Sequence, residues 1–221
     1  MRRSNLRARL LLGGAALAVV TLGTACSGDD TSSTSSGSGS AVATPAPVST
    51  IQSSIDPAQV LKDAVAGLAG GYHFVSNVVV NGTQTLLASG DRLGTGSRLD
   101  LTSNGATVKY IILPDASWAQ PEGGDWELLD VPPASTDPMS ALTAPVSIGV
   151  LADAGGEVKL RVTVLATALG VGSEGNAEVD VIINGGTLTE VDYATPVAGG
   201  IASVATTFGP VVDPTPITAP A

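Results

Sequence analysis

Hydrophobic and polar positions alternate along most of the chain between residues 72 and 208. The alternation is clearest from Glu157 to Leu165, where four aliphatic side chains are separated by polar ones. A period of two is typical of strands with one dry and one solvated face, as in antiparallel sheets. The pattern predicts strands at 72–80, 83–88, 97–102, 106–113, 118–121, 126–129, 157–165, 177–183, 187–193 and 201–208.

Short turn sequences separate neighbouring strand segments. Asn-Gly pairs stand at 81–82 and 104–105, and both residues of such a pair accept the positive φ that a two-residue hairpin turn requires. The glycine-containing segments 122–125 and 184–186 indicate two further hairpins. Hairpins that follow one another along the chain predict an antiparallel meander.

Helical periodicity is confined to a few places. Asp56 can cap a helix that starts with Pro57, and apolar residues follow at 3.6-residue spacing until Gly70-Gly71 ends it. Shorter helical segments are expected at 137–142, 147–152 and 166–169. Helices so few cannot cover both faces of a sheet, so we expect them on one side. The fold class is therefore α+β.

The first 26 residues carry an export signal. Four arginines precede an uncharged apolar run at 10–22, and the small residues 23–25 stand directly before Cys26. The run is shorter than the roughly 18 apolar residues that a transmembrane helix needs. Cys26 is the only cysteine, which excludes an internal disulfide. We expect residues 1–25 to be cleaved and Cys26 to carry fatty acyl chains, as in bacterial lipoproteins.

Lipidation of Cys26 would tether the protein to the extracytoplasmic face of the cell membrane, where two or more acyl chains hold stably. The alternative is ordinary secretion with a free thiol at Cys26. Residues 26–55 are rich in Ser, Thr, Gly, Ala and Pro, a composition typical of flexible linkers. One domain is expected at 56–211, followed by an extended, proline-containing tail at 212–221.

The charge of the predicted mature chain excludes some partners. The leader holds four of the ten basic residues and no acidic residue, so six basic residues remain against twenty acidic ones, a net charge of −14. A surface this acidic repels nucleic acid and anionic lipid headgroups. We expect no nucleic-acid partner.

Catalytic and metal-binding patterns are weak. His73 is the only histidine and lies between Tyr72 and Phe74 at a predicted strand start, which favours an edge or surface position. The chain contains no G-x-S-x-G sequence and no carboxylate spacing of a calcium loop. We therefore expect neither an enzyme nor a cofactor or metal site.

The predicted dry face offers the candidate ligand-binding residues. The same aliphatic side chains either line an apolar cavity, if the helices stand off the sheet, or fill a core, if the helices pack down. Trp118 and Trp126 are interpreted as core residues; the alternative is that they lie exposed near a cavity mouth and contact lipid or a partner. The candidate cavity residues are Val78, Val80, Val108, Tyr110, Ile112, Leu160, Val162, Val164, Val181 and Ile183.

The order of these elements resembles the LppX/LprG-type lipoproteins of actinobacterial envelopes, which are similar to LolA-like lipoprotein carriers. The resemblance includes the hairpin around Gly124-Asp125-Trp126-Glu127 and the closing strand that ends at 208–212. It implies an antiparallel β half-barrel with helices on its concave face. The implied activity is non-covalent binding and transport of acylated lipids or glycolipids in an apolar cavity. The alternative is an envelope interaction module that has no cavity and binds a protein partner.

Overall fold

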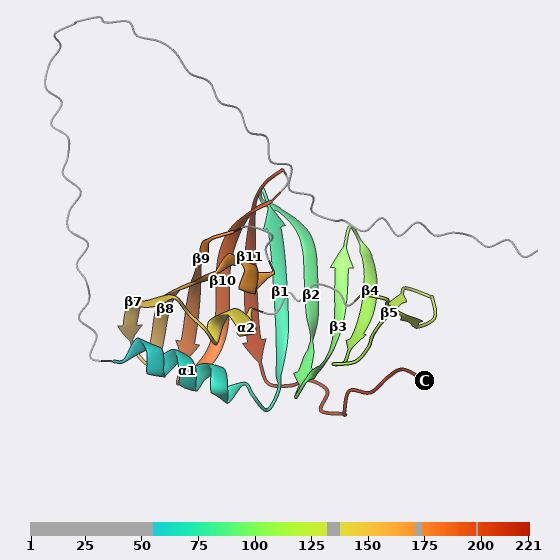
Figure 1. Cartoon of the computed structure of the whole chain (residues 1–221), viewed down its shortest axis with the longest axis horizontal. Coiled ribbons are helices and arrows are strands. Elements are labelled where there is room, and N and C mark those ends of the chain that lie inside the picture. Colours follow the sequence, from blue (N-terminus) through green and yellow to red (C-terminus); the bar gives the residue numbers. More distant parts are fainter. Residues whose placement is uncertain (1–54, 132–137, 171–173, 198) are drawn as a thin grey trace, which may run out of the picture.

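The computed structural model describes residues 55–131, 138–170, 174–197 and 199–221. The predicted leader, Cys26 and most of the predicted linker lie outside these residues. The described chain forms one open sheet of eleven antiparallel strands with two short α-helices packed on it (Figure 1). The predicted fold class, an antiparallel meander with helices on one face, is confirmed. Among the described residues, no helix is long and apolar enough to cross a membrane.

The helical elements are α1 (Pro57–Gly67), α2 (Met139–Leu142) and the 3-10 helix η1 (Ala166–Leu169). The strands are β1 (Tyr72–Val80), β2 (Thr83–Leu93), β3 (Gly96–Ser103), β4 (Ala106–Ile112), β5 (Ser117–Pro121), β6 (Glu127–Leu128), β7 (Ser147–Ala154), β8 (Glu157–Leu165), β9 (Asn176–Asn184), β10 (Thr187–Val197) and β11 (Gly200–Gly209).

Two meanders make up the sheet. Its strand order is β6-β5-β4-β3-β2-β1-β11-β10-β9-β8-β7, so β1 through β6 form one half and β7 through β11 the other. The halves join where β1 pairs with β11, with Phe74 opposite Phe208. Asn81 and Asn104 have φ of 50° and 51°, and the glycines that follow them also have positive φ. The two Asn-Gly hairpin turns are therefore confirmed.

Helix α1 begins as its sequence predicts. The Asp56 side chain accepts hydrogen bonds from the backbone N–H groups of Ala58 (3.0 Å) and Gln59 (3.3 Å). Leu61, Ala64 and Leu68 are buried against the sheet. Burial of this apolar stripe holds α1 on the sheet.

We call the sheet face that carries α1 and α2 the inner face and the opposite one the outer face. Both helices lie over the half formed by β7 to β11, and no described helix lies over β3, β4 and β5 (Figure 1). The main apolar core lies under the helices. Its buried members on the strands include Leu160, Val162, Val164, Val179, Val181, Ile183, Leu188, Val191, Phe74 and Phe208.

Two expectations are wrong. Segment 147–152 was predicted to be a helical turn, but it lies within edge strand β7, which pairs with β8. Ile148 and Val150 alternate on its inner face, and this pairing overrides the weak local preference. Trp118 and Trp126 are not among the buried core residues; both are partly exposed.

Candidate functional site

A trough runs between α1 and α2 on the inner face. Two neighbouring pockets of about 390 Å³ each share Val65, Ala66 and Thr143 in their walls. We call the combined space the helix trough. Its lining residues run along α1 from Ala58 to Ala66 and continue to Leu68 and Ala69 just after the helix. The helix trough therefore follows the length of α1 and is an elongated space.

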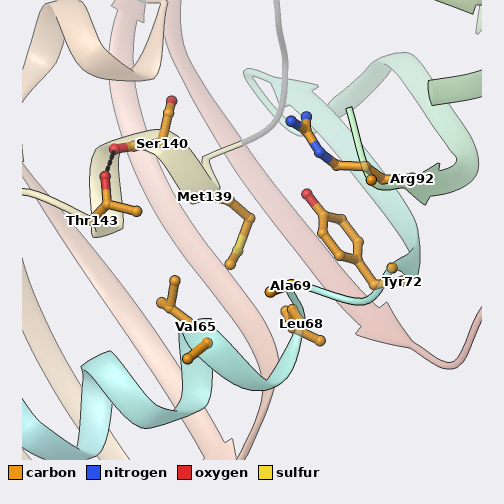
Figure 2. A pocket seen from close by; sticks show the side chains of 11 residues that line it. Val65, Leu68, Ala69, Tyr72, Arg92, Met139, Ser140 and Thr143 are labelled. Carbon is orange, nitrogen blue, oxygen red and sulfur yellow. Dashed lines mark hydrogen bonds between the residues drawn. The ribbon is translucent and has the colours of Figure 1, made fainter. Parts of the chain in front are cut away.

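One end of the helix trough lies where α1 meets β1 and β2. Figure 2 shows Leu68 and Met139 on its apolar side and the Tyr72 ring beside the Arg92 side chain. Tyr72 and Arg92 are cross-strand neighbours, which places both on the inner face. The Tyr72 ring is buried and packs edge-on against Phe208, with the ring centroids 5.5 Å apart. This end therefore combines a rigid aromatic wall with one guanidinium group.

Helix α2 supplies hydroxyl groups to the same end. Ser140 and Thr143 line the pocket, and the Thr143 hydroxyl donates a hydrogen bond to the Ser140 carbonyl oxygen at 2.7 Å (Figure 2). The other end of the helix trough is lined by Leu142, Ile148 and Lys62. Apolar walls with a few polar groups at the ends are typical of ligand sites.

The ten candidate cavity residues fall into two groups. Five are at most 1% exposed within the core: Leu160, Val162, Val164, Val181 and Ile183. The other five lie on β1 and β4, outside that core, and are partly exposed: Val78, Val80, Val108, Tyr110 and Ile112. None of the ten lines the helix trough.

The sequence analysis missed the residues that do line the trough. Ala66, Arg92 and Met139 come from three elements that are far apart along the chain. Only the apolar spacing of α1 pointed to any of them, because it marks the side of the helix that faces the protein.

A second cluster of polar side chains lies on the outer face. His73 Nδ1 is 2.9 Å from Asp91 Oδ1, and His73 Nε2 is 3.3 Å from Ser89 Oγ. Arg98, Lys109 and other side chains line the surrounding pocket of about 380 Å³. His73 thus lies in the central strand β1, and its side chain is 24% exposed on the outer face. Of the expected edge or surface position, the edge position is wrong.

The Asp91 carboxylate anchors the segment after β11. Its oxygens accept hydrogen bonds from the backbone N–H groups of Val212 (3.0 Å) and Asp213 (3.1 Å). Burial alone would raise the pKa of Asp91, but these bonds and the one to His73 outweigh it and hold the pKa below its ordinary value. Asp91 is therefore a carboxylate at neutral pH.

Acidic residues gather on the outer face of β9 and β10. Arg161 binds both carboxylate oxygens of Asp180, at 2.8 and 2.9 Å. Burial, and then the nearby Glu190 and Asp180, raises the pKa of Asp192 to about 6. No group of three or more potential metal ligands occurs among the described residues.

No protein-family model matches the chain, and no curated protein matches it. Its function is therefore argued from its own residues.

Proposed function

We propose that the protein is a membrane-tethered carrier of an acylated lipid or glycolipid, and that the acyl chain lies in the helix trough. One observation carries this proposal: the trough is elongated, apolar along its walls and bounded by polar groups at both ends. A linear chain with a polar headgroup has the same distribution of chemistry.

The energetics favour an acyl chain as the occupant. Each methylene removed from water contributes about 0.8 kcal/mol, so a chain of several carbons gains affinity from Leu68, Met139 and Ile148 without any specific polar contact.

Charge favours a polar or anionic headgroup at the ends of the helix trough. The predicted mature chain is strongly acidic, but the described residues that line the trough include Lys62 at one end and Arg92 at the other, and no acidic side chain. A headgroup carboxylate or phosphate would meet favourable charge at these two ends. Cys26 would supply the tether through its own acyl chains, which are separate from the bound ligand.

One observation favours the second candidate, an interaction module for a protein partner. Half of the predicted cavity residues fill a packed core, so the space between sheet and helices is narrow. The test below distinguishes the two candidates, because a module of this kind would bind no free acyl chain.

The experiment is a titration of the full chain in detergent-free buffer with a fluorescent 16-carbon fatty acid. Ala66 is exposed and lies in the shared wall of both pockets, so an Ala66→Trp substitution fills the trough without overpacking the core. Gln59→Trp is the matched control, because Gln59 is an exposed residue near the start of α1 that lines neither pocket. We expect saturable binding to wild type and Gln59→Trp, and at least tenfold weaker binding to Ala66→Trp. Absence of binding to wild type, or equal binding to all three, would contradict the proposal.

A further inference from the structure

Three side chains on the outer face form a continuous chain of hydrogen bonds. Ser89 Oγ lies 3.3 Å from His73 Nε2, and His73 Nδ1 lies 2.9 Å from Asp91 Oδ1. Strand pairing fixes this arrangement, because His73 is directly opposite Asp91 and Ser89 is two residues away on the same face of β2. A hydroxyl, an imidazole and a carboxylate in this order make up the hydrolytic triad.

A β-bulge brings the three residues to one face. Near the turn, Val80 pairs with Thr83 and Val79 with Gln84, but beyond it Val78 pairs with Leu86. The extra residue shifts the register by one, so that His73 meets Asp91 instead of Gly90. Without the shift, Ser89 and Asp91 would point to the opposite face from His73. Bulges that re-aim side chains are frequent beside active sites.

The hydrogen-bond partners fix the tautomer of His73. Asp91 is held by the N–H groups of Val212 and Asp213 and lies 3.6 Å from Arg98 Nε, so it is ionised and only accepts hydrogen bonds. The proton of a neutral His73 ring is therefore on Nδ1. The lone pair of Nε2 then faces the Ser89 hydroxyl, which is the arrangement in which imidazole removes a hydroxyl proton.

We propose that this cluster is an acyl-transfer site that cleaves small esters. Ser89 Oγ attacks the ester carbonyl carbon while its proton passes to His73 Nε2, and Asp91 is the positioning residue that orients the ring. The C–O bond to the alcohol then breaks, and the alcohol leaves with the proton from His73. Water, deprotonated by the same nitrogen, cleaves the acyl-Ser89 ester and restores the hydroxyl.

The surroundings define the substrate class and the rate. Trp126 and Ile111 line the pocket and offer apolar contact to a short acyl group. Backbone N–H groups of β1 and β2 are used in strand pairing, so the oxyanion must be met by a side-chain cation, for which Lys109 lines the pocket. Without a backbone oxyanion hole we expect acylation to be detectable and turnover to be slow.

The charged groups that face His73 in this pocket are Asp91, Arg98, Asp100, Lys109 and Asp213. Arg98 forms ion pairs with Asp91 and Asp213: its Nε is 3.6 Å from Asp91 Oδ2, and its Nη1 is 2.8 Å from Asp213 Oδ2. The reactive cluster is on the other side of the sheet from the helix trough. The result of the fatty-acid titration therefore neither supports nor contradicts the proposal of an acyl-transfer site.

The experiment is active-site labelling of the full chain with a fluorophosphonate, followed by peptide mass spectrometry. We expect one adduct on Ser89 in the wild type, none on that peptide in Ser89→Ala, and at least tenfold slower labelling in His73→Gln. The pH–rate profile of His73→Gln should differ from that of the wild type, because the imidazole takes part in the proton transfer. Ser203→Ala, an exposed serine on the outer face of β11, is the matched control and should label like wild type.

A p-nitrophenyl acetate burst of about one equivalent in wild type and none in Ser89→Ala would support the same assignment. Two outcomes would overturn it: no adduct on Ser89 in wild type, or an adduct whose rate is unchanged in a folded His73→Gln variant. Melting curves of each variant establish folding.

Discussion

Asp91 Oδ1 accepts a hydrogen bond from the backbone N–H of Val212 at 3.0 Å, which connects strand β2 to a residue 121 positions later. Asp91 Oδ2 accepts a second one from Asp213. Arg98 completes the attachment, since its guanidinium donates to the carbonyl oxygens of Asp213 and Thr215. The residues after β11 form no helix or strand, and two side chains hold them to the sheet.

Replacing Asp91 with Asn should release this segment. The variant loses charge-assisted bonds worth about 1.5–3 kcal/mol each, so the amides of Val212 and Asp213 should exchange with deuterium at least tenfold faster. Hydrogen-exchange mass spectrometry measures this directly. Asp100→Asn, on the same face of β3, should leave the two amides protected. Equal protection in wild type and Asp91→Asn would show that Asp91 is not the anchor.

The same attachment should depend on pH with a defined sign. The pKa of Asp91 is lowered in the folded protein, so its contribution is complete above the unfolded value of about 3.9 and is lost as pH falls through the folded value. Protection factors of the two amides should therefore be constant from pH 7 to pH 5 and decrease below about pH 4. A loss between pH 7 and pH 5 would contradict this assignment.

Asp192 should make stability depend on pH with the opposite sign to Asp91. Its pKa is raised to about 6, first by burial and then by the charge of Glu190, so the folded protein retains a proton that the unfolded chain has released. The free energy of unfolding should fall as pH rises from about 4 to about 6. Asp192→Asn should remove this dependence and raise Tm at pH 7. Asp125→Asn, at an exposed turn, is the control and should retain it.

A bulky Trp substitution should destabilise the protein at a core position of β8 but not at a surface position of the same strand. Val162 is fully buried, so Val162→Trp should lower the free energy of unfolding by about 1–3 kcal/mol or more. Leu165 is 52% exposed, and Leu165→Trp should change the free energy of unfolding by no more than about 0.5 kcal/mol. Urea unfolding measures both. If Val162→Trp is as stable as wild type, the helices stand off the sheet and the region is a cavity.

Cys26 should be needed for membrane association. Cys26→Ala removes the proposed site of acylation, and the described part of the chain contains no helix that could span the bilayer. We expect the variant in the soluble fraction and the wild type in the membrane fraction. Fractionation followed by immunoblotting measures the distribution. Membrane association of a cleaved Cys26→Ala protein would exclude this anchor.

The parts of the fold that depend on local chemistry were predictable. The Asn-Gly pair at 81–82 requires positive φ at both residues, and Asp56 followed by Pro57 determines a helix start within a few residues. Strand β8 and the 3-10 helix η1 have the bounds that their patterns predict. Each of these signals acts over a distance of two to four residues, which a sequence shows directly.

The two candidate sites were not predictable in the same way. The helix trough is formed by Ala66 and Met139, which share no pattern that would place their helices side by side. The pairing of His73 with Asp91 depends on an unpaired residue in β2, and a regular two-residue hairpin would place Gly90 opposite His73. Register beyond a bulge is set by packing against the next strand, which no local pattern encodes.

The pairing of β1 with β11 has a consequence for the order of folding. These are the first and the last of the described strands, yet they pair at the centre of the sheet rather than at an edge. Bringing Ser76 next to Thr206 closes a long loop, which costs entropy before any contact compensates for it. If the chain is exported as proposed, each meander can form hairpins as it emerges, but the halves can unite only after β11 has crossed. We expect the protein to remain in two unjoined halves, vulnerable to proteases, until translocation is nearly complete.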